Sequence, residues 1–292
     1  MRIFLTGASG FVGRQIARAL IALGYDVLAF TRGVGDFLSP AERGTALADA
    51  RAEIVVHAAW YVEHGAFWQA DVNRRWREES IRFIDEAKRA GVARFVGLGT
   101  CYEYAWPREG LCDERRTPLA THTPYDEAKS ETRAYLAARE SAGFSTAWAR
   151  LFFLYGEGEG ANRLAPSVAR ALLRGEKFRC SSGPLLRDFL DVREAGAAIA
   201  ALALSEVRGP VNIASGAPLS LGAFACMIGE ELGCPERVLT GARSDRPSEP
   251  PAIFAAVERL RNEVGYREAS SLRDGIRAFC ENQRSAILAD RI

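Results

Sequence analysis

The sequence lacks the cysteine and histidine patterns that usually bind metals. Its six cysteines form no C-x-x-C pair, and only three histidines occur in 292 residues. This spacing predicts no metal site. A chain of this size does not depend on disulfides either, so we expect free thiols in a reducing compartment.

The sequence also lacks a charge excess and a long apolar run. The net charge is +1, so there is no basic field for nucleic acid and no acidic tail. The longest mainly apolar run, residues 195–204, is too short to span a bilayer. The opening "MRIFLTGASG" reaches glycine by Gly7, unlike a signal peptide. We therefore expect a cytoplasmic protein that binds neither nucleic acid nor membrane.

Short apolar runs alternate with amphipathic stretches through the first half of the sequence. The expected strands are 2–7, 26–32, 53–60, 94–100 and 145–156, and the expected helices are 12–24, 39–50, 73–91 and 125–143. Strand–helix alternation of this kind predicts an α/β fold, a Rossmann-type doubly wound parallel sheet with helices on both faces.

The rhythm changes after Gly156, where strands become sparse. We expect a dinucleotide-binding domain over 1–156 and a smaller, mainly substrate-binding α/β lobe over 157–292. Runs 187–192 and 210–215 still resemble strands, so the chain is expected to return to the sheet within about 186–214. No flexible linker separates the two parts, which indicates two lobes around one cleft.

The first expected strand runs into a glycine-rich loop and then a helix. Such a loop lets the backbone approach a pyrophosphate, which the helix N-terminus attracts. The alternative is a tight turn without a ligand, which the strand–loop–helix context makes the weaker interpretation. The residues of this expected cofactor loop are Gly7, Ser9, Gly10, Phe11, Val12 and Gly13.

The second strand ends in Thr31 and Arg32, where an NAD site usually has an acid. An arginine suits a 2′-phosphate, so NADP(H) is favoured, with NAD(H) as the alternative. A solvated arginine without a ligand is the other interpretation. Asp36 is expected to border the adenine.

Tyr125 and Lys129 in "PYDEAKS" are four residues apart, so they share one helix face. The spacing alone does not separate a catalytic pair from two surface residues. Other motifs decide between these, and they follow one another along nearly the whole chain. They are the glycine loop, "HAAW", Asn73, "GLGT", "YDEAK", "RLFFLYGEGEG", "LLRDFLDV", "VNIASG" and "RPSEP".

Together these motifs resemble the extended short-chain dehydrogenases/reductases. The sequence is most similar to the nucleotide-sugar branch, the NAD-dependent epimerase/dehydratase family, and within it to the 4-ketoreductases of deoxysugar biosynthesis. The resemblance implies a catalytic triad of Thr100, Tyr125 and Lys129. Lys129 and the oxidised nicotinamide would draw the pKa of Tyr125 toward neutrality, and Thr100 would bind the carbonyl oxygen. Further cofactor contacts implied by the resemblance are Ala58, Ala59, Asn73, Tyr125, Lys129 and Phe152.

The substrate implied by the resemblance is a nucleotide-diphosphate sugar. Arg187 and Arg246 match positions that bind the diphosphate, although each could instead form a surface salt bridge. Phe178 and Cys180 could border the nucleobase or pack in a core. Tyr102 could contact the substrate or only pack. Phe153 replaces the family's usual asparagine, and Asn162 is expected to assume part of its role.

The residues after Thr100 distinguish reactions within the family. The 4,6-dehydratases have Asp and Glu there, whereas this chain has Cys101 and Tyr102. Glu103 comes one place later and should point to the other side of a strand-like segment, which disfavours dehydration. The leading hypothesis is NADPH-dependent reduction of the 4-keto group of a nucleotide-linked deoxysugar, with Tyr125 as general acid. The alternatives are an NAD-dependent nucleotide-sugar epimerase and a non-catalytic NADP-sensing or scaffold protein.

The last expectations concern the histidines, the tryptophans and the assembly of subunits. His57 should be a hydrogen-bonded core residue. His64 and His122 could border the substrate pocket, although nothing in the spacing requires it. The resemblance implies a homodimer through helices 73–90 and 125–142. Core or dimer contacts are expected for Trp60, Trp68, Trp76 and Trp106.

Overall fold

The core of the protein is a six-stranded parallel sheet. The computed structural model describes residues 1–181, 185–243 and 250–289. The strand order is β10-β6-β4-β3-β1-β2, and every pair is parallel. The strands are β1 (Arg2–Thr6), β2 (Asp26–Phe30), β3 (Ile54–His57), β4 (Arg94–Thr100), β6 (Ser145–Leu151) and β10 (Gly209–Ile213). Every residue of β3 and β4 is buried, as expected for strands covered on both faces.

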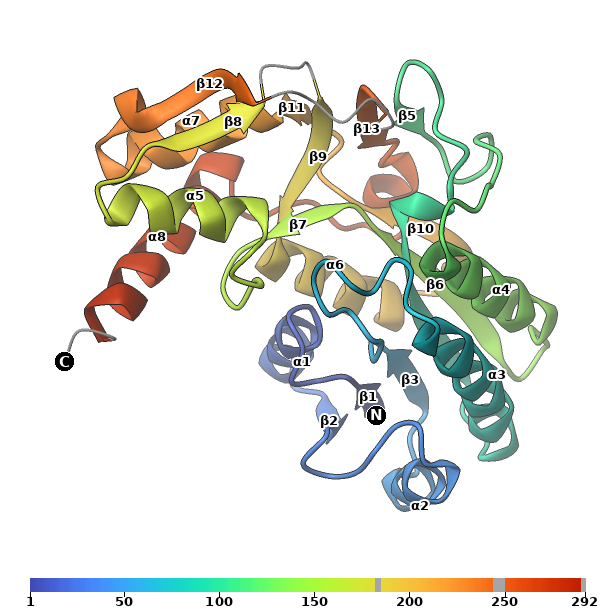
Figure 1. Cartoon of the computed structure of the whole chain (residues 1–292). Helices are drawn as coiled ribbons and strands as arrows, with labels where there is room; N and C mark the ends of the chain where they lie inside the picture. The colour runs from blue at the N-terminus through green and yellow to red at the C-terminus, as the bar shows by residue number, and fades with distance from the viewer. Residues whose placement is uncertain (182–184, 244–249, 290–292) are drawn as a thin grey trace.

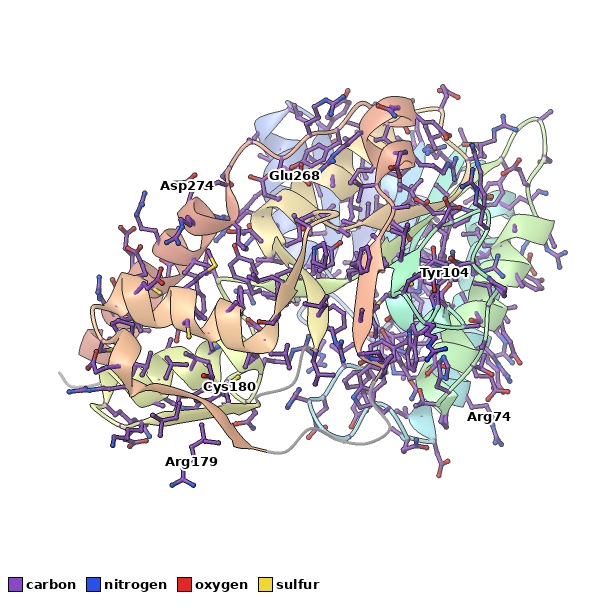
Figure 2. The ribbon with its side chains drawn as sticks, turned by 90° about the horizontal axis from the view of Figure 1, so that it is seen from above. Arg74, Tyr104, Arg179, Cys180, Glu268 and Asp274 are labelled. Atoms are coloured by element: carbon purple, nitrogen blue, oxygen red, sulfur yellow. The ribbon has the colours of Figure 1, made fainter. Side chains whose placement is uncertain are left out.

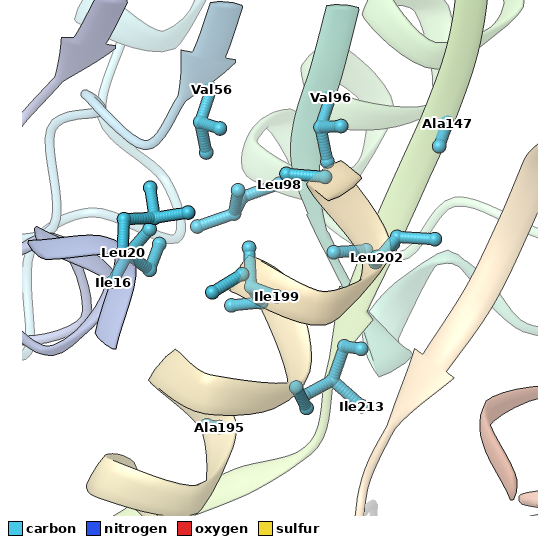
Figure 3. Packing of buried hydrophobic residues seen from close by; sticks show 14 of the residues in the cluster. Ile16, Leu20, Val56, Val96, Leu98, Ala147, Ala195, Ile199, Leu202 and Ile213 are labelled. Atoms are coloured by element: carbon cyan, nitrogen blue, oxygen red, sulfur yellow. The ribbon is translucent and has the colours of Figure 1, made fainter. Parts of the chain in front are cut away.

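Helices cover both faces of this sheet, which confirms the predicted Rossmann-type fold (Figure 1). One face carries α1 (Gly13–Ala22) and α6 (Val192–Leu204). Ile16 and Ile199 of these helices pack against Val56 and Val96 of the sheet (Figure 3). The opposite face carries α2 (Pro40–Ala50), α3 (Val72–Arg89) and α4 (Pro124–Ala138), which pack in a second core with Phe4, Phe95 and Trp148.

The predicted strand 145–156 is two strands that diverge at Phe152. β6 stays in the central sheet, whereas β7 (Phe153–Tyr155) pairs with β9 (Leu186–Asp191). The prediction that 187–192 returns to the central sheet is therefore wrong, and the prediction for 210–215 is confirmed by β10. β6 already has β4 and β10 as its two neighbours, so no pairing edge remains for β9 beside it.

β9 instead belongs to a second sheet above the central one. Its order is β11 (Pro218–Ser220), β9, β13 (Ala252–Ala255) and β5 (Leu111–Cys112), with β7 on the side of β9. The prediction from sequence missed β5, β11 and β13 because each is only two to four residues long.

The remaining elements form a smaller lobe at one end of the molecule, at the upper left of Figure 1. The lobe contains α5 (Leu164–Leu173), α7 (Leu221–Leu232), α8 (Leu272–Ala289), and the parallel pair β8 (Phe178–Ser181) and β12 (Val238–Arg243). Phe224, Ile228 and Phe279 form its core. Within the described ranges, none of the helices has the length and apolar content needed to cross a membrane.

Candidate active site

A cavity of about 870 Å³ opens at the carboxyl ends of the central strands, between the sheet and the smaller lobe. The strand order reverses between β1 and β3, and ligands of open α/β sheets bind at such a switch point. The predicted site residues that line it are Gly7, Ser9, Gly10, Phe11, Val12, Gly13, Thr31, Arg32, Asp36, Ala58, Ala59, Thr100, Tyr102, Tyr125, Lys129, Phe152, Asn162 and Arg187. Positions far apart in sequence thus share one wall.

The glycine loop packs so tightly that side chains would not fit. Gly10 donates its backbone N–H to the Gly7 carbonyl at 2.9 Å, which closes the turn before α1. Gly7 has φ +70°, and a Cβ there would lie 2.7 Å from the Ala59 nitrogen. A Cβ at Gly13 would overlap the Gly7 carbonyl. The bare backbone and the start of α1 therefore form a cradle whose shape and dipole suit a diphosphate.

Thr100, Tyr125 and Lys129 lie together in the cavity wall. Thr100 ends β4, and the other two occupy the first two turns of α4, which Thr123 caps. Lys129 donates a hydrogen bond from Nζ to the Leu98 carbonyl at 2.8 Å, so α4 is fixed beside the end of β4. All three side chains are nearly buried.

The indole of Trp60 covers the amino group of Lys129. The Nζ atom lies 3.7 Å from the ring centroid, a cation–π contact. Trp60 in turn donates from Nε1 to the Asn73 side-chain oxygen at 3.0 Å. The lysine charge is therefore held by the Leu98 carbonyl and an aromatic face.

Burial shifts the pKa values of Lys129 and Tyr125, the two α4 residues that line the cavity. It lowers the pKa of Lys129 to about 7, against the opposing effect of Glu103. It raises the pKa of Tyr125, and the charge of Glu103 adds to this, while Arg163 lowers it. Burial thus outweighs the lowering effect of Arg163. The expected shift toward neutrality depends also on the charge of the oxidised nicotinamide and stays a prediction. At neutral pH the phenol carries its proton.

Glu103 stabilises the site from the side that faces away from the cavity. The expected strand-like segment is the 3₁₀ helix η1 (Cys101–Glu103), while Cys101 and Tyr102 line the cavity. The Glu103 carboxylate accepts hydrogen bonds from the Thr100 N–H at 3.0 Å and from Trp148 Nε1 at 2.9 Å. It also pairs with Arg150 at 3.0 Å. The acid therefore points away from the cavity, as predicted, although in a different local structure.

Removing this acid should destabilise the fold. Glu103→Ala leaves the buried Arg150 guanidinium without its carboxylate, which should lower the free energy of unfolding by about 3–5 kcal/mol. Glu157→Ala is the matched control, because its ion pair with Arg18 is exposed and should contribute less than about 1 kcal/mol. Urea unfolding of both variants would measure this. An equal loss of unfolding free energy in Glu103→Ala and Glu157→Ala would contradict a structural role for Glu103.

Three predicted contacts are not part of this cavity wall. Asn73 is fully buried, and its amide donates to the carbonyls of Phe67 and Ala70 while its oxygen accepts from Trp60. It therefore anchors the loop that carries Trp60. Arg246 lies outside the described residues.

Phe178 and Cys180 belong to β8 and pack in the core of the smaller lobe. Figure 2 shows Cys180 within that lobe, well apart from Tyr104 beside α4. Of the two alternatives predicted for Phe178 and Cys180, the structure therefore supports packing in a core.

Arg187 is 4 % exposed in the floor of the cavity, on β9. Its guanidinium donates to the carbonyls of Leu186 and Pro250 and lies 5.4 Å from the Phe153 ring. The guanidinium is thus held in a fixed position in the cavity lining.

Several lining residues were not predicted from the sequence. The predicted apolar contacts are present for Trp60, which belongs to a buried cluster, and for Trp68 and Trp76, which pack against it; all three also line the cavity. Trp68 lies 4.4 Å from Tyr102 and 5.4 Å from Tyr125, between ring centroids. The signal was available for Trp60, which directly follows "HAA" at the end of β3. Glu159 and Arg163 also line the cavity. His64 lines it too, in agreement with the pocket position that the sequence left open for it.

The other two histidines have structural partners. His57 is buried between Thr6 at 2.8 Å and Ser80 at 2.9 Å, which confirms the predicted core role. Burial lowers its pKa, so the ring is neutral. His122 stacks on Trp106 and contacts the Tyr104 carbonyl at 3.0 Å.

Comparison with known proteins assigns the family. The model of the NAD dependent epimerase/dehydratase family matches residues 3–214. A dTDP-6-deoxy-L-talose 4-dehydrogenase (NAD(P)(+)) of Kitasatospora kifunensis is 28% identical, over 99% of this chain and 97% of its own length. A dTDP-glucose 4,6-dehydratase of Streptomyces griseus is 28% identical, over 94% of this chain and 92% of its own.

A solved structure supports the fold independently. The UDP-glucose 4-epimerase of Thermus thermophilus, in complex with NAD, superposes with a TM-score of 0.84 at 20% identity, covering 98% of this chain and 100% of that one. The family model covers most of the sequence. The protein therefore belongs to the NAD dependent epimerase/dehydratase family, in the nucleotide-sugar branch of the extended short-chain dehydrogenases/reductases.

Proposed function

We propose that the protein reduces the 4-keto group of a nucleotide-linked deoxysugar with NADPH. The observation that carries this proposal is one cavity that joins a diphosphate cradle to a protonated Tyr125 beside Thr100 and Lys129. A relative matched over nearly its whole length is named a dTDP-6-deoxy-L-talose 4-dehydrogenase using NAD(P). Such a dehydrogenase interconverts a 4-hydroxyl and a 4-ketone, which is the same chemistry in either direction.

The cofactor would lie along the glycine loop toward α4. Gly7–Gly13 would hold the pyrophosphate, and Thr31, Arg32 and Asp36 border the adenosine end of the cavity. When bound, NADPH supplies the hydride that reduces the ketone. Lys129 would bind hydroxyls of the nicotinamide ribose, since its Nζ uses one donor on Leu98 and faces the cavity.

The proton is supplied by Tyr125. Its buried phenol holds the proton at neutral pH, so it can donate to the carbonyl oxygen as negative charge develops there. Thr100 lies in the same wall and donates its hydroxyl hydrogen to that oxygen. A charged Lys129 would stabilise the resulting phenolate.

The substrate would occupy the end of the cavity near the smaller lobe. Arg187 offers a buried cation for the diphosphate, and Asn162 also lines the cavity. Trp68 and Tyr102 present aromatic faces near Tyr125, which suit the apolar face of a deoxysugar. A homodimer through α3 and α4 stays a prediction.

Arg32 should set the preference for NADPH. Arg32→Ala removes the cation proposed to bind the 2′-phosphate, so the Kd of NADPH should rise about tenfold while that of NADH stays the same. Arg51→Ala, an exposed arginine after α2 and outside the cavity lining, is the control. Fluorescence titration with both cofactors measures the two constants. An equal change for NADPH and NADH would contradict the assignment.

An epimerase is the second candidate, favoured by the structural similarity to a UDP-glucose 4-epimerase with NAD. An epimerase returns the hydride to the sugar and leaves the cofactor unchanged, whereas a reductase consumes it. Deuterium-labelled NADPH with dTDP-4-keto-6-deoxyglucose separates the two reactions. Deuterium at C4 of the product supports the reductase. Interconversion of saturated nucleotide sugars with NAD⁺, without net reduction of the cofactor, would support the epimerase.

A further inference from the structure

Glu159 is a buried acid in the cavity wall that the proposed chemistry does not use. It lies on the loop 156–163 that leads from β7 to α5. Its side chain is only 5 % exposed. One carboxylate oxygen lies 3.5 Å from the Arg163 Nε. The other has no hydrogen-bond partner within the described part of the chain.

The loop is built so that this acid faces inward. Glu159 donates its N–H to the Gly156 carbonyl at 3.2 Å, and Gly158 has φ +82°. Gly158 packs so closely on the Arg14 guanidinium that a Cβ there would lie 2.6 Å from it. Glu157 points outward to an exposed ion pair with Arg18. The loop is thus fixed on α1, with one glutamate outside and the other inside.

An unpartnered oxygen of this kind is costly. A buried acceptor without a donor destabilises the fold, and burial raises the pKa of Glu159 to about 7 despite Arg163. A group kept at such a cost in a cavity wall indicates a ligand that completes its hydrogen bonds. In its ionised form Glu159 can only accept, so the missing partner is a donor, and a phosphate oxygen would be repelled.

We propose that Glu159 forms a subsite for a neutral ligand hydroxyl, which donates a hydrogen bond to the unpartnered carboxylate oxygen. Arg163 compensates the charge from the other side. The hydroxyl belongs either to the sugar of the substrate or to the nicotinamide ribose of the cofactor. The first source rests on the proposed function, whereas the second requires only the cofactor.

Equilibrium binding to the full-length protein tests this subsite with two variants and a control. Glu159→Ala removes the acceptor, and Glu159→Gln keeps an amide oxygen of the same shape. The control is Glu157→Ala, on the same loop but outside the cavity lining. The probes are NADPH alone and, with NADP⁺ present, dTDP, dTDP-glucose, UDP and UDP-glucose.

If the hydroxyl belongs to the sugar, Glu159→Ala should weaken the binding of dTDP-glucose or UDP-glucose about tenfold. The binding of dTDP, UDP and NADPH should not change. A ribose hydroxyl predicts the same loss for NADPH, with the nucleotides unaffected. In both cases Glu159→Gln should lose less binding affinity than Glu159→Ala, and Glu157→Ala should lose none. The melting temperature of Glu159→Ala should stay equal or rise, because an unpartnered buried acid is removed.

The proposal is overturned if Glu159→Ala binds every probe like the wild type, or if it weakens a diphosphate and its glucose ester equally. A lower melting temperature without a change in affinity would make Glu159 structural. If the wild type binds none of the four nucleotides, dTDP- and UDP-linked sugars are excluded as substrates. The NADPH titration then decides the role of Glu159 by itself.

Discussion

Tyr125→Phe should lower kcat by about 10²–10⁴-fold with the Kd of NADPH unchanged within about twofold. The variant removes only the hydroxyl that is proposed to protonate the ketone. The ring itself packs edge-on against Phe67 at 4.8 Å and Trp68 at 5.4 Å, and phenylalanine keeps both contacts. The loss should therefore appear in the chemical step and not in folding or cofactor binding. Steady-state kinetics and NADPH titration would measure the two effects separately.

A matched control is available on the same helix. Tyr135 also lies on α4, but its hydroxyl donates to Asp85 on α3, away from the cavity. Tyr135→Phe should retain full activity. Comparable losses in the two variants, or activity of Tyr125→Phe within about threefold of the wild type, would remove Tyr125 from the reaction.

Lys129→Met should lose activity and gain stability below pH 7. The ammonium is proposed to bind the cofactor ribose and stabilise the Tyr125 phenolate, so kcat/KM should fall about 10²-fold or more. Methionine is unbranched and fills a similar volume against Trp60. Opposite changes of activity and stability are typical of a functional residue and not of a structural one.

The sign of the stability change follows from the pKa of Lys129. The folded value of about 7 is below the ordinary 10.5, because burial disfavours the charged amine. Between about pH 7 and 10.5 the unfolded chain binds more protons, so this group makes wild-type stability rise with pH in that window. Below pH 7 the full free-energy penalty of burying the charged Lys129 amine remains, and Lys129→Met removes it.

Urea unfolding should therefore favour Lys129→Met at pH 6 by a difference on the order of 1–4 kcal/mol, and this difference should disappear near pH 10. Lys177→Met, at an exposed lysine outside the cavity lining, should change neither stability nor activity. A Lys129→Met variant that is less stable at pH 6 would show that the amine stabilises the fold.

The sequence was most informative where function depends on neighbouring residues. The glycine loop needs glycines three residues apart, and Tyr125 and Lys129 need one helical turn, so both patterns can be recognised from neighbouring residues. Long-range packing was not readable in this way. A Cβ at Gly99 would overlap the Trp148 indole and the Glu103 carboxylate, which come from β6 and η1. The second glycine of "GLGT" makes room for that network.

The same limit explains the residues that were missed or misplaced. Whether a tryptophan faces a core or a cavity depends on loop geometry, and Trp68 reaches Tyr102 only because residues 58–71 fold over the site. Glu157 and Glu159 have the same spacing to glycine, yet one points outward and the other inward, since Gly158 packs on Arg14. β9 left the central sheet because β10, from later in the chain, occupies the edge of β6.

The central claim is that the cavity reduces a nucleotide-linked 4-ketosugar with NADPH. The most direct test follows absorbance at 340 nm with NADPH or NADH and a panel of dTDP-, CDP- and GDP-4-keto-6-deoxysugars. We predict that at least one ketosugar causes NADPH oxidation, and that NADH is used less efficiently. No oxidation with any ketosugar, together with interconversion of saturated nucleotide sugars by the same protein, would contradict the claim and establish the epimerase.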